Sequence, residues 1–245
     1  MKTLIRVALI ASFAAPLAWS AGTVKVYIPD STQPKTLTNA GHLIDLVGQP
    51  RLANSWWPGA VIAERQKTAE AEQQYKALLA RLTGLAEQEE GDDAAAINSV
   101  RQQVQALKIT GRLPVNLDPD DVRVSENGNP ALEGEYTLWL PAQPSTITVF
   151  GLISHPGKKP FTPGRDVVSY LDEQSLLSGA DNSYAWVVYP DGHTQKAPVA
   201  YWNKRHIEPM PGSIIFVGFA DHFWTKGYDG LNADILRSLI QRIPE

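Results

Sequence analysis

Several features are missing from this chain, and each absence narrows its function. There is no cysteine, which excludes disulfides, thiolate metal sites and a lipid on a mature N-terminal cysteine. After the first 20 residues no segment approaches the roughly 20 apolar residues that a membrane-spanning helix needs. The formal net charge is −4 and no basic stripe of the nucleic-acid-binding kind is visible. We therefore expect no nucleic-acid partner and no stable membrane insertion.

Signatures of catalysis are also missing. The sequence has no Gly-x-Ser-x-Gly elbow, Walker loop or dinucleotide fingerprint, and its five histidines show no metal-ligand spacing. A glycoside hydrolase needs two carboxylates across a cleft, whereas the acidic runs at 118–121 and 172–173 are typical of a turn and a helix face. We expect no catalytic residue, metal or cofactor.

The first 20 residues have the layout of a secretory signal peptide. Lys2 and Arg6 precede a short apolar run at 7–15, and the small residues Ala18 and Ser20, with the bulkier Trp19 between them, follow in the cleavage region. A buried N-terminal helix is the alternative, but the basic start and a strand-like segment at 23–27 disfavour it. We predict cleavage near Ser20 and a soluble periplasmic protein.

A helical hairpin is predicted at 62–108. Apolar residues spaced for one helix face form two stripes, namely Tyr75, Leu78, Leu79, Leu82 and Leu85, then Ile97, Val100, Val104 and Leu107. The acidic segment 87–93 between them is typical of a solvated turn and lacks the ligand spacing of an EF-hand. Two matching stripes joined by a short turn indicate an antiparallel pair of helices.

The strand-rich zones on either side of this hairpin resemble each other. The matching segments are 24–26 with 147–149, 43–46 with 167–170, and 136–140 with 213–217. The first two pairs of segments, which start before the hairpin, are separated by more residues than the third pair, and the difference is about the length of the hairpin. A diverged repeat with an insertion in its first copy therefore explains the spacing of all three pairs.

Each copy runs strand–strand–helix–strands, the order of a β-grasp fold. We therefore predict an α+β protein with two tandem β-grasp (ubiquitin-like) domains at 21–141 and 142–220. The hairpin is inserted in the first domain, and an amphipathic helix at 228–244 ends the chain.

Two sets of segments carry a family resemblance. Residues 148–157 (TVFGLISHPG), 178–181 (SGAD) and 211–217 (PGSIIFV) resemble the soluble-ligand-binding β-grasp domains, called SLBB domains, of outer-membrane polysaccharide exporters. Ser213 replaces the usual acid of the Pro-Gly-Asp turn. The whole chain is similar to the GfcC/YjbG family of capsule and exopolysaccharide operons. The segments that carry this similarity are 40–59 (AGHLIDLVGQPRLANSWWPG) and 200–206 (AYWNKRH). The resemblance implies a role in exopolysaccharide assembly or export.

The resemblance also implies a role for Arg112, because an arginine shortly after the hairpin lines a cleft in this family. Gly111 lets backbone approach closely, and a guanidinium offers a planar fork to a sugar carboxylate or phosphate. The alternative is a structural arginine paired with Asp118, Asp120 or Asp121.

Aromatic residues suggest a further ligand or partner surface. Flat rings stack on sugars, but they also fill cores. Trp139 and Trp186 lie in mid-strand, so we expect them to be buried or half-buried. The expected surface residues lie in loop-like, more exposed segments and are Trp56, Trp57, Tyr201, Trp202 and Arg205.

The terminal helix has two interpretations. In exporters that resemble this chain, a comparable helix enters the outer membrane. Here the helix carries only two basic residues, Arg237 and Arg242, which disfavours a membrane-surface role. We expect the helix to dock against its own β-grasp domain.

These observations predict a non-catalytic, monomeric periplasmic accessory protein. Its partner would be the outer-membrane polysaccharide exporter or the exopolysaccharide itself. The alternative is a carbohydrate-modifying hydrolase or lyase acting at a cleft near Arg112, which would require a carboxylate or histidine beside that residue.

Overall fold

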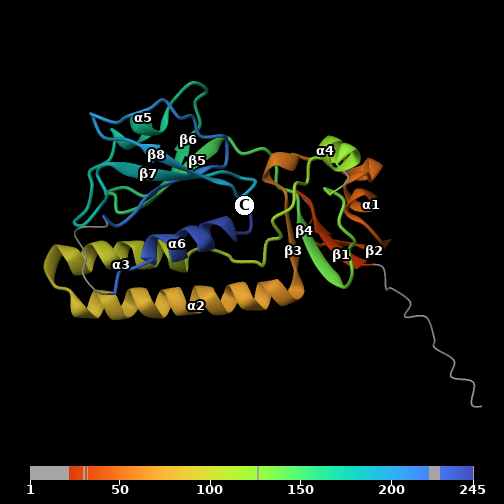
Figure 1. Cartoon of the computed structure of the whole chain (residues 1–245), viewed down its shortest axis with the longest axis horizontal. Coiled ribbons are helices and arrows are strands. Elements are labelled where there is room, and N and C mark those ends of the chain that lie inside the picture. Colours follow the sequence, from red (N-terminus) through yellow and green to blue (C-terminus); the bar gives the residue numbers. More distant parts are fainter. Residues whose placement is uncertain (1–21, 30, 32, 126, 221–226, 245) are drawn as a thin grey trace, which may run out of the picture.

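A computed structural model of the chain describes residues 22–29, 31, 33–125, 127–220 and 227–244 (Figure 1). The predicted signal peptide lies outside the described residues. The first part of the chain forms β1 (Gly22–Tyr27), β2 (Lys35–Ala40), α1 (Leu43–Val47), β3 (Val61–Glu64), α2 (Arg65–Gln88), α3 (Gly91–Gln105), α4 (Pro119–Val124) and β4 (Glu135–Trp139). The second part forms β5 (Thr146–Gly151), β6 (Gly157–Pro160), α5 (Val167–Leu171), β7 (Tyr184–Val188), β8 (Thr194–Pro198), β9 (Ile214–Val217) and α6 (Leu231–Ile240).

The first domain is a four-stranded mixed sheet in the order β2-β1-β4-β3. Strands β1 and β4 run parallel, and the outer pairs are antiparallel. The alternation of β1 buries Val24 and Val26 on one face, where they join Leu43 and Leu46 of α1 in one core.

The second domain repeats this arrangement with one more strand, in the order β6-β5-β9-β7-β8. The short helix α5 buries Val167 and Tyr170 against one face of the sheet. Asp166 caps this helix by accepting a hydrogen bond from the Ser169 backbone N–H at 2.9 Å.

The sequence repeat corresponds to a structural repeat, and the register of the strands is preserved. Val26 of β1 lies opposite Leu138 of β4, and the matching residue Val149 of β5 lies opposite Ile215 of β9. The short helices α1 and α5 follow the second strand of each copy. The prediction of an α+β fold with two tandem β-grasp domains is confirmed.

The helical hairpin begins later than predicted. Residues 62–64 belong to strand β3, because Ile62 pairs with Leu138 in the sheet. The two helices then cover 65–88 and 91–105. The equivalent of β3 in the second domain is β7, and the chain turns back after it to form the edge strand β8. In the first domain the chain instead leaves the sheet after β3 and enters α2.

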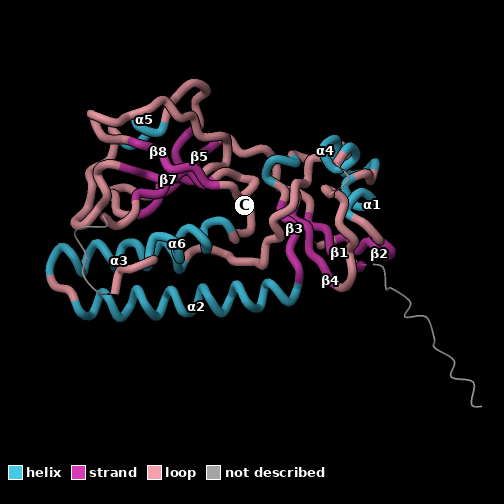
Figure 2. Tube along the Cα trace, in the orientation of Figure 1, coloured by secondary structure: helices cyan, strands magenta, loops and turns pink. Residues whose placement is uncertain are grey.

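The hairpin departs from the first domain and packs on the second, as Figure 2 shows. Its apolar stripes, the outer face of the second sheet and α6 share one core. Members of this shared core include Leu82, Ile97, Val100, Phe150, Phe216, Ile235 and Leu239. Gln103 of α3 also hydrogen-bonds the backbone of Gly151 in both directions, at 2.7 and 2.9 Å.

The terminal helix therefore docks on its own protein, as expected. Its Ile235 and Leu239 are fully buried between the hairpin and the second sheet. Arg81 of α2 fixes the helix from outside through Asp234 at 2.7 Å. Within the described residues, no helix combines the length and hydrophobicity needed to cross a membrane.

Candidate functional site

A cavity of about 410 Å³ lies where the two domains, the end of α3 and the C-terminal tail meet. The tail closes one side, because Ile243 donates its backbone N–H to the Lys108 carbonyl at 2.7 Å. The linker between the domains contributes Pro141 and Pro144 to the wall. The cavity is thus lined by both domains, the linker, the end of the hairpin and the tail.

Arg112 reaches this cavity from the segment that follows the hairpin. Its Nη2 donates to the carbonyl oxygen of Pro190 at 2.8 Å and to that of Ala60 at 3.4 Å. Its Nη1 donates to the carbonyl oxygen of Ile240 at 3.4 Å. One guanidinium therefore joins the first domain, the β7–β8 turn of the second domain and the end of α6.

The alternative pairing of Arg112 with Asp118, Asp120 or Asp121 is wrong. Within the described part of the chain, the hydrogen bonds of this guanidinium all go to backbone carbonyls. Asp118 instead caps α4 by accepting from the Asp120 N–H at 2.9 Å, and Asp120 pairs with Arg123.

Burial lowers the pKa of Arg112 to about 10, and the negative charge of Asp191 acts in the opposite direction. The side chain stays cationic near neutral pH in spite of this shift. Gly192, next to Asp191, lies against the guanidinium, because a Cβ placed there would be 3.0 Å from its Cζ. The 190–193 turn thus forms one wall beside Arg112.

Three further cations line the cavity, and they come from distant parts of the chain. They are Lys108 at the end of the hairpin, Lys158 of β6 and Arg242 of the tail. Among the described lining residues there is no Asp, Glu or His. The nearby Asp191 carboxylate pairs with His193 Nδ1 at 2.8 Å, and both side chains are more than half exposed outside the lining.

The two adjacent tryptophans, Trp56 and Trp57, lie in different environments. Trp56 is half-buried and lines the cavity, where its ring lies against Gly59 and faces Gly212 of the second domain. Trp57 is only 9% exposed and belongs to the core of the first domain. The expectation that Trp57 is an exposed ligand-binding residue is therefore wrong, because neighbouring side chains in the tight turn at 57–59 point in different directions.

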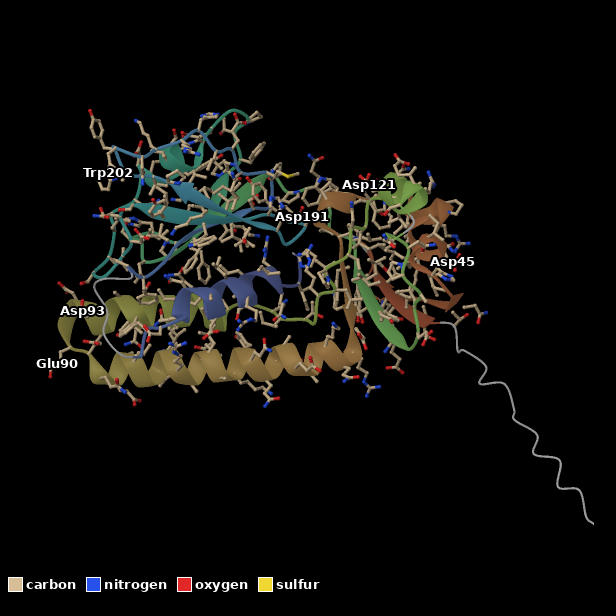
Figure 3. All side chains as sticks on the ribbon, in the orientation of Figure 1. Asp45, Glu90, Asp93, Asp121, Asp191 and Trp202 are labelled. Carbon is tan, nitrogen blue, oxygen red and sulfur yellow. The ribbon has the colours of Figure 1, made fainter. Side chains whose placement is uncertain are left out.

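The other predicted surface residues lie elsewhere. Tyr201, Trp202 and Arg205 are exposed in the loop that follows β8. Figure 3 shows Trp202 at the outer end of the second domain, far from Asp191 beside the cavity. Trp139 and Trp186 are half-buried, as expected from their positions in strands. The structure thus groups Arg112 with Trp56 and places the other exposed aromatics apart.

Sequence reasoning missed Lys108, Lys158 and Arg242. Each lies on a separate element, and no local spacing links them. One weak signal existed for Lys158, which directly follows the segment 148–157 that carries the resemblance to SLBB domains. The convergence of the cations depends on the packing of the tail and the hairpin.

The loop beyond β8 is tied to α5 through His206. Its Nε2 lies 2.7 Å from Glu208 Oε1, and its Nδ1 lies 3.7 Å from Asp166 Oδ2. The hydrogen bond to Glu208 raises the pKa of His206 above its ordinary value, and the charges of Glu208 and Asp166 add to this effect. The folded state therefore favours the charged imidazole.

A pH dependence follows from this arrangement. Because the folded pKa is raised, the contribution of His206 to stability is complete below its unfolded pKa of about 6.5 and is lost as pH rises through the folded value. We expect Glu208→Gln to lower the pKa of His206, measured by NMR titration of the ring protons. An unchanged midpoint would show that Glu208 is not the main cause.

The fold and the site together define a class: a two-domain β-grasp protein whose domains are joined by an inserted helical hairpin over a cationic cavity. Two family models match the chain, described as "Capsule biosynthesis GfcC, N-terminal" over residues 20–143 and "Capsule biosynthesis GfcC C-terminal" over residues 155–244. The chain belongs to the GfcC family of capsule biosynthesis proteins, which gives it a role in capsule or polysaccharide production.

A relative supports the same assignment. The chain is 68% identical over 239 residues to "Uncharacterized protein YjbG" of Escherichia coli (strain K12), and the match covers 98% of each chain. The predicted resemblance to the GfcC/YjbG family is confirmed.

Proposed function

We propose that this protein is a non-catalytic periplasmic accessory of capsule or exopolysaccharide production, and that its interdomain cavity binds an acidic unit of the polymer. The observation that carries the proposal is the lining of the cavity, where the side chains of four cationic residues from distant parts of the chain meet, namely Lys108, Arg112, Lys158 and Arg242. The family assignment supplies the polysaccharide context.

The chemistry of the cavity suits an acidic sugar. A carboxylate or phosphate accepts charge-assisted hydrogen bonds from guanidinium and ammonium groups, and the indole of Trp56 offers a flat face to the C–H groups of a sugar ring. The volume of about 410 Å³ lies within the range typical of small-ligand sites. The cations would select ligands that carry a negative charge, and Trp56 would add a preference for a sugar ring.

The same lining argues against a glycoside hydrolase, because such an enzyme needs two carboxylates that flank the scissile bond. A lyase is the second candidate that the lining allows. Cations could neutralise a uronate carboxylate while a lysine such as Lys108, in its neutral form, takes the C5 proton as a general base. The C4–C5 double bond would then form as the C4–O glycosidic bond breaks, and the leaving sugar oxygen would take a proton from water. The two functions differ in whether the polymer stays intact.

A partner protein fits the same proposal. The second domain carries the segments that resemble the soluble-ligand-binding domains of polysaccharide exporters, so a monomer that holds polymer could pass it to an exporter in the outer membrane. In this form of the proposal the cavity contacts the polymer, and the outer surface of the second domain contacts the exporter.

The direct test is charge reversal in the cavity. We expect Lys108→Glu to weaken binding of a short uronate oligosaccharide about tenfold, because it places a negative charge where the carboxylate would sit. The control is Lys76→Glu, which makes the same charge change on an exposed position of α2 outside the cavity lining. Isothermal titration calorimetry at two salt concentrations measures both variants.

Three outcomes would contradict the proposal. Equal affinity of Lys108→Glu and Lys76→Glu would remove the cavity from the binding site. Equal affinity for acidic and neutral oligosaccharides would remove the role of the cations. A falling molar mass of the polymer, with ultraviolet absorbance from unsaturated uronate, would replace the binding function by a lyase.

A further inference from the structure

The loop at 200–206 carries the most exposed large aromatic side chains among the described residues. Tyr201 is 92% exposed and Trp202 is 73% exposed. Most other large aromatics are buried or half-buried, and Trp57, Tyr170 and Phe216 belong to the three cores. Two adjacent exposed rings contribute almost nothing to the fold, so their presence points to an external contact.

The loop that carries these rings is an ordered turn. The backbone N–H groups of Asn203 and Lys204 both donate to the Ala200 carbonyl, at 3.1 and 2.9 Å. The Asn203 side chain donates to the Ser183 carbonyl at 3.2 Å, which ties the turn to the start of β7. The rings are therefore presented on a fixed support, which lowers the entropy cost of binding a ligand.

The loop itself carries basic residues and no acidic residue. From Thr194 to Ile207 the sequence contains no Asp or Glu, and the next acidic side chain, Glu208, pairs with His206. Lys204 and Arg205 are exposed in the loop itself. In the adjacent hairpin, the Lys196 Nζ lies 4.2 Å from the centre of the Tyr184 ring. The loop thus combines flat apolar faces with cations.

We propose that the loop at 200–206 is a second, external binding site for an acidic polysaccharide, in which Tyr201 and Trp202 stack on sugar rings and Lys204 and Arg205 contact carboxylates or phosphates. The proposal rests on the proposed function in one respect, namely that the partner is a polysaccharide. None of these four residues lines the interdomain cavity. A long polymer could therefore occupy both sites, and each site would raise the effective concentration at the other.

The alternatives fit the loop less well. A stable protein interface needs about 800 Å² from each partner, and two side chains on one turn supply much less. Anchoring in a lipid surface requires a broad apolar face in addition to basic residues, whereas this loop exposes two rings and no aliphatic side chain. The combination favours a narrow ligand that offers both ring faces and negative charge.

The test compares ligands of two lengths. We expect the double variant Tyr201→Ala/Trp202→Ala to bind a long acidic polysaccharide about tenfold more weakly, the order expected for lost ring stacking. Its affinity for the short uronate oligosaccharide should stay within twofold of the unaltered protein. The matched control is Tyr27→Ala, which removes a partly exposed aromatic ring from the first domain. Affinity electrophoresis in gels that contain the long polymer measures the first effect, and calorimetry measures the second.

The outcomes separate this proposal from the one for the cavity. Weaker polymer binding by the loop variant would support the external site at 200–206. If Lys108→Glu at the same time bound the short uronate oligosaccharide as well as the unaltered protein does, the proposed site in the cavity would be overturned. Unchanged polymer binding by the loop variant would overturn the loop site. Loss of binding to phosphatidylglycerol-containing vesicles, without loss of polymer binding, would also overturn it and assign the loop to a lipid surface.

Discussion

Replacing Gly151 by alanine should lower the free energy of unfolding by about 4 kcal/mol, near the upper end for single substitutions. Gly151 is the last residue of β5 and has a φ of 104°, a backbone conformation that residues other than glycine rarely adopt. A Cβ at this position would lie 2.0 Å from the carbonyl oxygen of Val217. Because that oxygen belongs to the backbone of the parallel strand β9, the clash can be relieved only by separating the central strands of the second sheet.

Gly164→Ala is the matched control for this prediction. Gly164 also has a positive φ of 78°, but a Cβ there would meet no atom within 4 Å. We expect a loss of only about 1 kcal/mol, which reflects the backbone conformation alone. Urea unfolding followed by circular dichroism measures both variants. Equal losses would show that the close approach to Val217 relaxes at little cost.

Leu239→Ala should lower the free energy of unfolding by about 3 kcal/mol, as expected for a large-to-small change in a core. Leu239 is fully buried in the core that the hairpin, the second sheet and α6 share. Arg237→Ala on the exposed side of the same helix should cost less than about 1 kcal/mol, since its ion pair with Asp234 lies at the surface.

Hydrogen exchange gives the Leu239 prediction a sharper form. Since the core is shared, the amides of α3 and β9 should lose protection in Leu239→Ala together with those of α6. Loss of protection confined to α6 would contradict the shared core. It would mean that the terminal helix is an independent attachment.

The architecture of the two sheets was predictable because it depends on local patterns. The similarity of segments 24–26 and 147–149 and of the short helical segments 43–46 and 167–170 predicted the repeat, and the shared register of Val26 and Val149 confirms it. The sheet on which the hairpin packs was not predictable in the same way. A stripe such as Leu78 and Leu82 shows that a helix has a buried face, but not which sheet covers that face.

The candidate site was predictable only in part, for the same reason. Arg112 was expected from a family resemblance, whereas the close packing of Gly192 against its guanidinium is visible only in the folded state. Its partners are backbone carbonyls, which no sequence pattern reveals. The different environments of Trp56, which lines the cavity, and Trp57, which is buried in the core, could not be told apart from the sequence.

The position of the hairpin sets an order of events when the chain is made. A ribosome builds α2 and α3 before it reaches β5, so the leucine face of the hairpin exists before the sheet that covers it. The last element of that core in chain order is α6, which follows β9. The nascent hairpin therefore needs protection from aggregation until β5, β9 and α6 have been made, and a chain cut at the linker would leave both halves with an uncovered apolar face. Although its sequence reads as two modules, the protein completes its folding as one unit.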